Sequence, residues 1–282
     1  MIRWNINQPI PHPRSSNAAQ HHMQVIPVLD LMIGQVVLAQ GGNRDEYRPV
    51  HSRLTGSSQP LDVAQAIFNQ TGCNWLYVAD IDSFAGAAPN WQVYQQLLER
   101  GFGLWIDADW LTNDRYLQIT DRLKYEKLKV IVSSETLSSV EQFSAFETLT
   151  QNNVSVIFSL DKKGDAVISQ TGSLAEWSPA DLVQRVYAHG VRDLIVLDLN
   201  QVGTGQGFQA ASSSAALIQS LKQDFPDLSI TSGGGVRGPE DVQQWIANGC
   251  DHVLVASAIH SGAFTPDDIA TNQQKPSLNK DN

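Results

Sequence analysis

The sequence predicts an α/β protein, a single TIM (β/α)8 barrel built of two similar half-barrels. Short apolar runs rich in β-branched residues recur along the chain with amphipathic segments between them, which is the alternation of a parallel sheet covered by helices. The first four runs also resemble the last four. A length of 282 residues is enough for one such barrel with a sizeable core.

Eight runs are predicted to be the strands, because most of them are apolar at nearly every position, as strands buried on both faces must be. They cover residues 25–31, 75–81, 103–108, 129–133, 154–160, 193–199, 228–232 and 252–256. A doubly wound open sheet is the alternative. It requires a reversal of strand order that no feature of the sequence indicates.

The segments between these runs are predicted to be helices that cover the barrel. Apolar residues recur at helical spacing in segments 61–71, 90–100, 138–150, 178–189, 211–222 and 239–248. A glycine, which readily adopts the positive φ that ends a helix, precedes four of the strands, at Gly72, Gly101, Gly190 and Gly249.

The two halves of the chain repeat one strand plan. V-I-P-V-L-D, which ends at Asp30, matches V-I-F-S-L-D, which ends at Asp161. The second and sixth runs also match, as do the fourth and eighth, whereas the third and seventh fit poorly. Two similar halves form a barrel with approximate twofold symmetry, so the two aspartates should lie on opposite sides of the same mouth.

Composition excludes several classes of protein. The chain has 19 Lys and Arg against 29 Asp and Glu, a formal net charge of -10, and no basic stripe, so a nucleic-acid partner is not expected. Cys73 and Cys250 are its two cysteines, too few for a disulfide framework or a cysteine metal site. His21 and His22 are interpreted as plain surface residues. We predict neither a metal nor a cofactor.

The chain is predicted to consist of a polar N-terminal extension (1–22), the barrel (23–264) and a flexible C-terminal tail (265–282). The extension lacks the apolar core of a signal peptide, and no run of about 18 apolar residues occurs. A cytoplasmic protein with no membrane partner is therefore expected. The sequence leaves the oligomeric state open.

Asp30 and Asp161 are the candidate catalytic residues. Both end predicted strands, and the active sites of TIM barrels lie at the carboxyl ends of the strands. Two carboxylates that face one another across a pocket can act as base and acid on one substrate. The matched positions favour catalysis over helix capping. For Asp80, Asp82 and Asp198, helix capping or pairing with lysines is the preferred interpretation.

A phosphate-binding site is predicted after the seventh and eighth strands. T-S-G-G-G-V-R-G-P-E-D-V (231–242) runs from a strand through a glycine triplet into a helix, where bare backbone N–H groups can bind a phosphate. Gly234 and Gly235 provide these groups, and Ala256 and Ser257 follow the eighth strand. A small phosphorylated metabolite is the expected partner.

The segment 39–60 is predicted to be a charged loop that closes over an anionic substrate. Arg44 and Arg53 are its candidate ligands, because guanidinium groups bind phosphate or carboxylate with paired hydrogen bonds. Arg48, His51 and Tyr47 also lie in this loop. Local ion pairs with neighbouring acids are the alternative role for any one of the arginines.

Over residues 23–263 the chain resembles the histidine-biosynthesis barrels, most of all their ribotide isomerase branch. The resemblance is carried by V-I-P-V-L-D-L-x-x-G-x-V-V, L-Y-V-A-D-I-D, F-S-L-D, G-T-G and S-G-G-G-V-R. It implies an aldose–ketose isomerase (an intramolecular oxidoreductase) that performs an Amadori rearrangement of a phosphorylated aminoaldose. It also implies that Asp30 is the general base at sugar C2, that Asp161 is the general acid at the ring oxygen, and that Gly203 and Thr204 belong to the binding site.

The chain departs from that isomerase at the first of its two phosphate sites, where the family has a glycine-rich turn after the third strand. Here the third run reads L-W-I-D-A-D-W-L, with Asp107 and Asp109, and the fourth strand is followed by Glu135. Carboxylates repel phosphate. The first-half phosphate site is therefore predicted to be absent, and Trp105 and Trp110 are interpreted either as part of the altered site or as space-filling residues.

Three functions remain open from the sequence. The first is an isomerase of the histidine-biosynthesis type. The second is a related barrel enzyme acting on a different, monophosphorylated metabolite whose amine faces the new acids. The third is a non-catalytic barrel that binds a phosphorylated metabolite. Replacing either catalytic aspartate by asparagine separates the first two from the third.

Overall fold

Eight parallel strands close into a barrel in the computed structural model, which describes residues 25–39, 44–123, 126–170, 174 and 176–272. In order around the barrel they are β1 (Val25–Met32), β4 (Trp75–Asp80), β5 (Gly103–Asp107), β6 (Leu128–Ser133), β7 (Ser155–Lys163), β9 (Asp193–Asp198), β10 (Ser229–Gly233) and β11 (His252–Val255). β11 pairs with β1 and closes the sheet. The predicted TIM barrel is confirmed, and each predicted run overlaps one strand.

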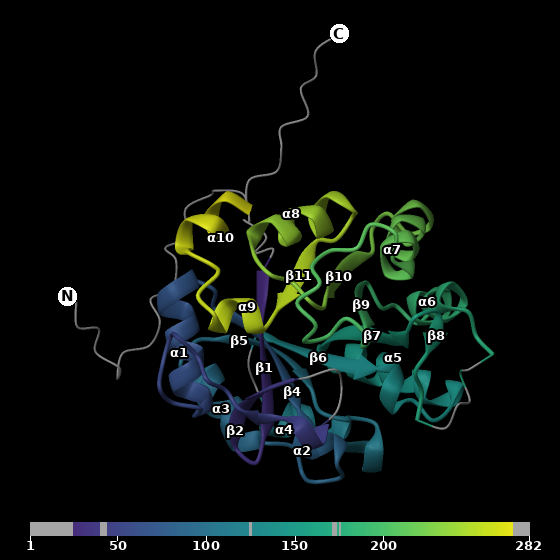
Figure 1. Ribbon diagram of the computed structural model, residues 1–282. Coiled ribbons are helices and arrows are strands. Elements are labelled where there is room, and N and C mark those ends of the chain that lie inside the picture. Colours follow the sequence, from purple (N-terminus) through teal and green to yellow (C-terminus); the bar gives the residue numbers. More distant parts are fainter. Residues whose placement is uncertain (1–24, 40–43, 124–125, 171–173, 175, 273–282) are drawn as a thin grey trace, which may run out of the picture.

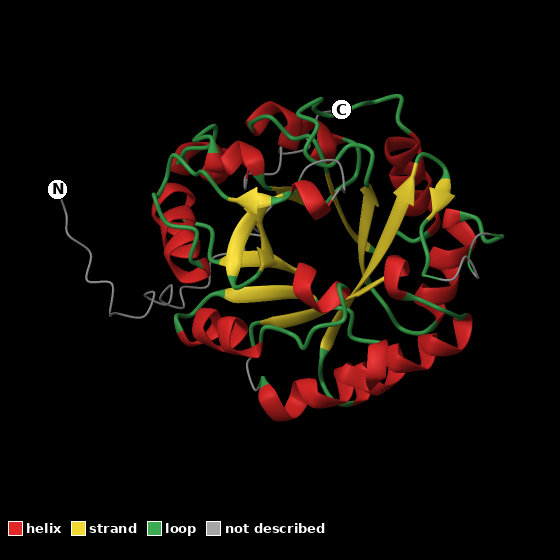
Figure 2. Cartoon of the chain, turned by 60° about the horizontal axis from the view of Figure 1, so that its bottom comes forward, coloured by secondary structure: helices red, strands yellow, loops and turns green. Residues whose placement is uncertain are grey.

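Helices form a ring outside these strands (Figure 2). Six of them match the predicted segments: α1 (Pro60–Thr71), α3 (Trp91–Glu99), α5 (Ser144–Gln151), α6 (Pro179–Ala188), α7 (Ser213–Asp224) and α8 (Pro239–Ala247). α1 begins with a proline in its first turn and ends at Gly72, whose φ of 74° lets its N–H donate to the Phe68 carbonyl.

The apolar core has two layers, because successive side chains of a strand point to opposite faces. One layer fills the barrel interior and includes Ile26, Trp105 and Ile157. The other lies between the barrel and the helices and includes Leu29 and Phe158. Side chains two or four positions along a strand from an interior residue therefore also point inward.

Several short elements in the loops were not predicted. β2 (Gln35–Leu38) folds back on β1, and β3 (Arg48–Pro49) pairs with β2. β8 (Ala166–Val167) pairs with β7 in the same antiparallel way. Three short α-helices also lie in these connections: α2 (Ile81–Phe84), α4 (Ile119–Arg122) and α9 (Ser257–His260). Figure 1 shows them near the strand ends.

Within the segment predicted to be a C-terminal tail, residues Pro266–Asn272 form a helix, α10. The Thr265 hydroxyl and the Asp268 carboxylate cap its first turn reciprocally. Ile269 is buried in the outer core layer as α10 packs against α1 and α8. The predicted N-terminal extension, 1–22, lies outside the described residues. Among the residues that are described, no helix is long and apolar enough to span a bilayer.

Candidate active site

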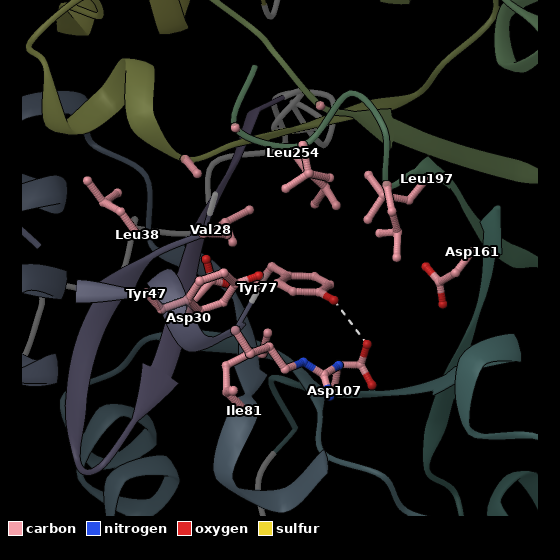
Figure 3. A pocket seen from close by; sticks show the side chains of 18 of the residues that line it. Val28, Asp30, Leu38, Tyr47, Tyr77, Ile81, Asp107, Asp161, Leu197 and Leu254 are labelled. Atoms are coloured by element: carbon pink, nitrogen blue, oxygen red, sulfur yellow. Dashed lines mark hydrogen bonds between the residues drawn. The ribbon is translucent and has the colours of Figure 1, made fainter. Parts of the chain in front are cut away.

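A cavity of about 440 Å³ opens at the carboxyl ends of the strands (Figure 3). Its volume is in the usual range for sites that bind small molecules. Both candidate catalytic aspartates line it, together with most of the predicted binding residues: Asp30, Asp161, Arg44, Gly203, Gly234, Gly235, Ala256 and Ser257. Residues far apart in the chain therefore meet at one mouth.

Asp30 and Asp161 lie on opposite walls of this cavity (Figure 3). β1 and β7, which carry them, are four strands apart in either direction around the barrel. Asp30 shares the inward face of β1 with Ile26, and Asp161 shares that of β7 with Ile157. The side chains are 9% and 5% exposed, so each carboxylate is removed from bulk water while it faces the cavity.

Three hydroxyl groups surround Asp161. Ser133 and Ser159 donate to its carboxylate, the latter at 3.0 Å, and the Asp161 amide donates to Ser134 Oγ. Burial raises the pKa of Asp161 to about 6, although the bonds from the two serines oppose the rise. The ionised form of this carboxylate is therefore well solvated by protein groups.

Asp30 has a less polar environment. Burial raises its pKa to about 7, opposed by a hydrogen bond from the Ala39 backbone. Its neighbours along the cavity wall include Val28, Leu38 and the buried Tyr47. The protonated form is thus favoured at Asp30 more than at Asp161, and both carboxyls titrate near neutral pH, where acid–base exchange with a substrate is most efficient.

The predicted phosphate site, which we call the glycine cradle, comprises Gly203 after β9, Gly234 and Gly235 after β10, and Ser257 at the start of α9. Gly234 and Gly235 have φ values of 96° and 67°, a conformation that other residues rarely adopt. Their loop is tied to the preceding one by a 2.8 Å bond from the Gly207 amide to the Gly235 carbonyl. Among the described residues, neither the Gly234 nor the Gly235 amide has a hydrogen-bond acceptor, so both are available to an anion.

Thr204 does not line the cavity. Its hydroxyl donates to the Gln201 carbonyl at 2.8 Å, and it lies 3.0 Å from the position that a Cβ on Gly235 would occupy. Thr204 therefore packs against Gly235 without lining the cavity.

A search of protein families matches residues 24–265 to the family described as histidine biosynthesis protein. The chain belongs to this family. An uncharacterised protein of Methanocaldococcus jannaschii is 29% identical over 252 residues, which cover 88% of this chain and 97% of that protein. The phosphoribosyl imidazole-4-carboxamide isomerase of Photobacterium profundum is 24% identical over 263 residues, covering 86% and 97%. The isomerase of that name from Leuconostoc mesenteroides is 25% identical over 245 residues, covering 86% and 96%.

Arg44 and Arg53, the two arginines predicted to bind an anionic substrate, lie in different parts of this histidine-biosynthesis barrel. Arg44 lines the cavity and pairs with Glu135 at 2.9 Å. Arg53 does not reach the cavity. Its amide donates to the His260 carbonyl at 2.9 Å, and its side chain lies in a separate depression with Asp62. The backbone of this loop is therefore fastened to α9, which directs the Arg53 side chain away from the mouth.

The acids and tryptophans around β5 do not form one group. Asp107 faces the cavity, whereas Asp109 lies outside its lining, 3.8 Å from Arg115. Trp105 packs inside the barrel against His252. Trp110 packs in the outer layer, where its Nε1 donates to the Ile106 carbonyl. Both tryptophans are core residues, as the space-filling interpretation held.

Of the other acids at strand ends, Asp80 caps a helix, whereas Asp82 and Asp198 accept hydrogen bonds from amides of turns. Asp80 accepts from the Ser83 amide at the start of α2 and from Asn90. Asp82 accepts from the Ile33 amide, and Asp198 from the Asn200 amide. Asp80, Asp82 and Asp198 are absent from the cavity lining.

The sequence analysis missed the cavity residues Tyr77 and Lys163, whose side chains are polar. The hydroxyl of the buried Tyr77 donates to Asp107 at 3.0 Å (Figure 3), and the exposed Lys163 also lines the cavity. The two-residue periodicity of strands could have identified both, because Lys163 is two positions after Asp161 and Tyr77 is two before Ala79. Among the described residues, no group of three or more His, Cys, Asp or Glu is arranged to hold a metal.

Proposed function

We propose that the protein is an aldose–ketose isomerase that acts on a small phosphorylated metabolite through proton transfer by Asp30 and Asp161. The observation that carries this proposal is the position of the two buried carboxyls on opposite walls of one cavity. Membership of a family that includes phosphoribosyl imidazole-4-carboxamide isomerases supports the reaction class.

The reaction needs one base and one acid. The acid protonates the ring oxygen of an N-linked aldose, so that the ring opens to an imine. The base removes the proton from C2, and the electron pair of that C–H bond forms an enolamine that tautomerises to the ketose. One carboxyl on each side of the sugar can serve both proton transfers, because protons enter and leave from different faces.

The surroundings of the two carboxyls support Asp161 as the base and Asp30 as the acid in the free enzyme. Burial raises the pKa of both carboxyls, to about 7 at Asp30 and about 6 at Asp161. The hydrogen bonds from Ser133 and Ser159 oppose the rise at Asp161 and stabilise its ionised form. This is the reverse of the assignment that the family resemblance implies, and the two assignments can be separated by experiment.

The phosphate of the substrate binds at the glycine cradle in this proposal. The amides of Gly234 and Gly235 are available there, and the first turn of α9 begins at Ser257 beside them. Lys163 lines the same cavity and adds a positive charge. Among the described residues, the opposite wall offers Asp107 and no comparable set of glycines, which supports a substrate with one phosphate.

The test measures deuterium incorporation at C2 by NMR when aldose monophosphates and their N-glycosyl amines are incubated in heavy water. We expect incorporation with the unchanged protein and a loss of about a hundredfold or more in Asp30→Asn and in Asp161→Asn, with circular dichroism unchanged. Binding without exchange in the unchanged protein would contradict the proposal and support a binding protein.

The pH dependence of the residual exchange rate in each variant tests which aspartate is the base and which is the acid. If Asp161 is the base, the residual rate of Asp161→Asn should fall as pH rises through about 7, because only the protonated Asp30 is active. The residual rate of Asp30→Asn should rise through about 6. The opposite slopes would reverse the assignment.

A further inference from the structure

Asp107 is a buried carboxylate with one unused oxygen at the cavity wall. Its side chain lines the cavity and the residue is 5% exposed. Oδ2 accepts a 3.0 Å hydrogen bond from the Tyr77 hydroxyl (Figure 3), whereas Oδ1 has no partner among the described residues. A buried polar atom without a partner is uncommon in a folded protein and calls for a group that the free chain lacks.

The strand register places Asp107 at the counterpart of the glycine cradle. Asp30 pairs with Ala79, which pairs with Asp107. In the second half, Asp161 pairs with Leu197. Val196, one position before Leu197, pairs with Ser232, so Gly233 is level with Leu197. Asp107 thus occupies in the first half the position that Gly233, the first glycine of the triplet, occupies in the second.

Asp107 and the cradle also face each other across the mouth. β5 and β10 are four strands apart in either direction around the barrel, as are β1 and β7. The line from the cradle to Asp107 therefore crosses the line from Asp30 to Asp161. A ligand that reaches from one to the other passes between the two catalytic carboxyls.

The charges near Asp107 favour a cation. Asp161, Glu135 and Asp109 all act to raise the pKa of Asp107 well above its usual value, although burial is the larger cause. Glu135 already has a cation, Arg44, at 2.9 Å. Among the described residues, Asp107 is hydrogen-bonded to a neutral tyrosine and is acted on by the charges of further acids. An added cation would relieve the repulsion and give the unused oxygen a partner.

We propose that Asp107 binds the protonated amine of a substrate whose phosphate occupies the glycine cradle. The inference rests on the proposed function for the phosphate end alone. The substrate class is an amine-bearing monophosphate, held at its two ends by β5 and β10 with its reacting carbons between Asp30 and Asp161. Tyr77 acts as a positioning residue, since its hydroxyl holds Oδ2 and leaves Oδ1 directed to the ligand.

Titration calorimetry with simple probes tests this arrangement. Aminohexyl phosphate should bind about tenfold more tightly than hydroxyhexyl phosphate, because a charge-assisted hydrogen bond is gained. Hexane bisphosphate should bind more weakly than either. Binding of the amine should release a proton near neutral pH, as the cation stabilises ionised Asp107, and the measured heat should then vary with the ionisation enthalpy of the buffer.

Two variants provide the controls. Asp107→Asn keeps an acceptor for Tyr77 and should abolish the preference for the amine and the proton release, with binding of hexyl phosphate unchanged. Asp121→Asn alters an exposed acid on α4, outside the cavity, and should leave the preference intact. Equal binding of the amino and hydroxy probes, or a preference that survives Asp107→Asn, would overturn the inference.

The same experiment distinguishes an error in the proposed phosphate site from an error in the amine site. If none of the phosphate probes binds, the proposed phosphate site is wrong. The amine site would still be supported if hexylamine bound to the unchanged protein and did not bind to Asp107→Asn. If hexylamine did not bind to the unchanged protein, the amine site would be wrong as well.

Discussion

At the scale of single residues, two aspartates at matching places have different chemical properties because their neighbours differ. Ser133 and Ser159 donate to Asp161, while Asp30 lies nearer to apolar side chains such as Val28. Hydrogen-bond donors lower a carboxyl pKa and burial raises it, which separates the values to about 6 and about 7. A pair of identical residues can thus divide the work of acid and base.

Asp30 is expected to lower the stability of the fold at neutral pH. Its pKa is about 7 in the folded chain against 3.8 ordinarily, so the folded state holds an extra proton between these values. The contribution of the protonated Asp30 to the free energy of unfolding is fully present below about pH 4 and is lost as pH rises through about 7. At roughly 1.4 kcal/mol per pKa unit, the loss is at most about 4 kcal/mol.

Asp30→Asn, which does not titrate, should therefore unfold at higher denaturant concentration than the unchanged protein at pH 8, with the advantage disappearing towards pH 4. Urea unfolding at several pH values measures this difference. Asp121→Asn, at an exposed carboxylate on α4, is the control and should follow the unchanged protein. A gain for Asp30→Asn that does not depend on pH would contradict the expectation.

At the scale of elements, the cradle depends on backbone conformation rather than on side chains. Gly235 has a φ of 67°, and a Cβ there would lie 3.0 Å from Thr204 Oγ1 and 3.2 Å from the Gln201 carbonyl oxygen. A side chain would both strain the backbone and push the two loops apart. The proposed phosphate site therefore needs glycine at this position.

Gly235→Ala should weaken the binding of hexyl phosphate about tenfold or more, because the amides no longer converge. Gly190→Ala is the matched control. Its φ of 89° makes it similarly strained, at about 1–2 kcal/mol, but no atom lies within 4 Å of the added Cβ and it is remote from the cavity. It should lose stability and keep its affinity. Equal affinities for both variants would exclude Gly235 from the site.

At the scale of the whole molecule, closure of the barrel creates two crossing axes at its mouth. One joins β1 to β7 and carries the candidate acid and base. The other joins β5 to β10 and carries the two ends of the proposed binding site. In the second axis an acid stands opposite the glycines, so a ligand with unlike ends fits better than one with two phosphates.

This arrangement predicts a result in a living cell. The isomerase of Photobacterium profundum is named for a compound with two phosphoribosyl groups. Expression of the present protein should not restore growth without histidine to a bacterial strain that lacks such an isomerase. Restored growth by the unchanged protein would show that the second phosphate is accepted despite Asp107.

The barrel and much of the candidate site were predictable because they depend on short-range periodicity. Alternating side chains fix which residues of a strand face inward, and the repeated motif marked Asp30 and Asp161 before any contact was known. Asp109 and Arg53 were not placed correctly by this reasoning. Asp109 has a φ of 46°, which turns the chain after β5, and Arg53 lies in a loop whose course is set by its bond to His260.

The sequence by itself determined the eight strands, their covering helices and the matched pair of aspartates, because each follows from local apolar patterns and their repetition. Only the tertiary structure decided which acids have partners. Arg44 neutralises Glu135 from 91 positions away, and Tyr77 holds Asp107 from 30 positions away. Such contacts depend on the closure of the barrel and the course of its loops, and they leave one oxygen of Asp107 unused at the cavity wall.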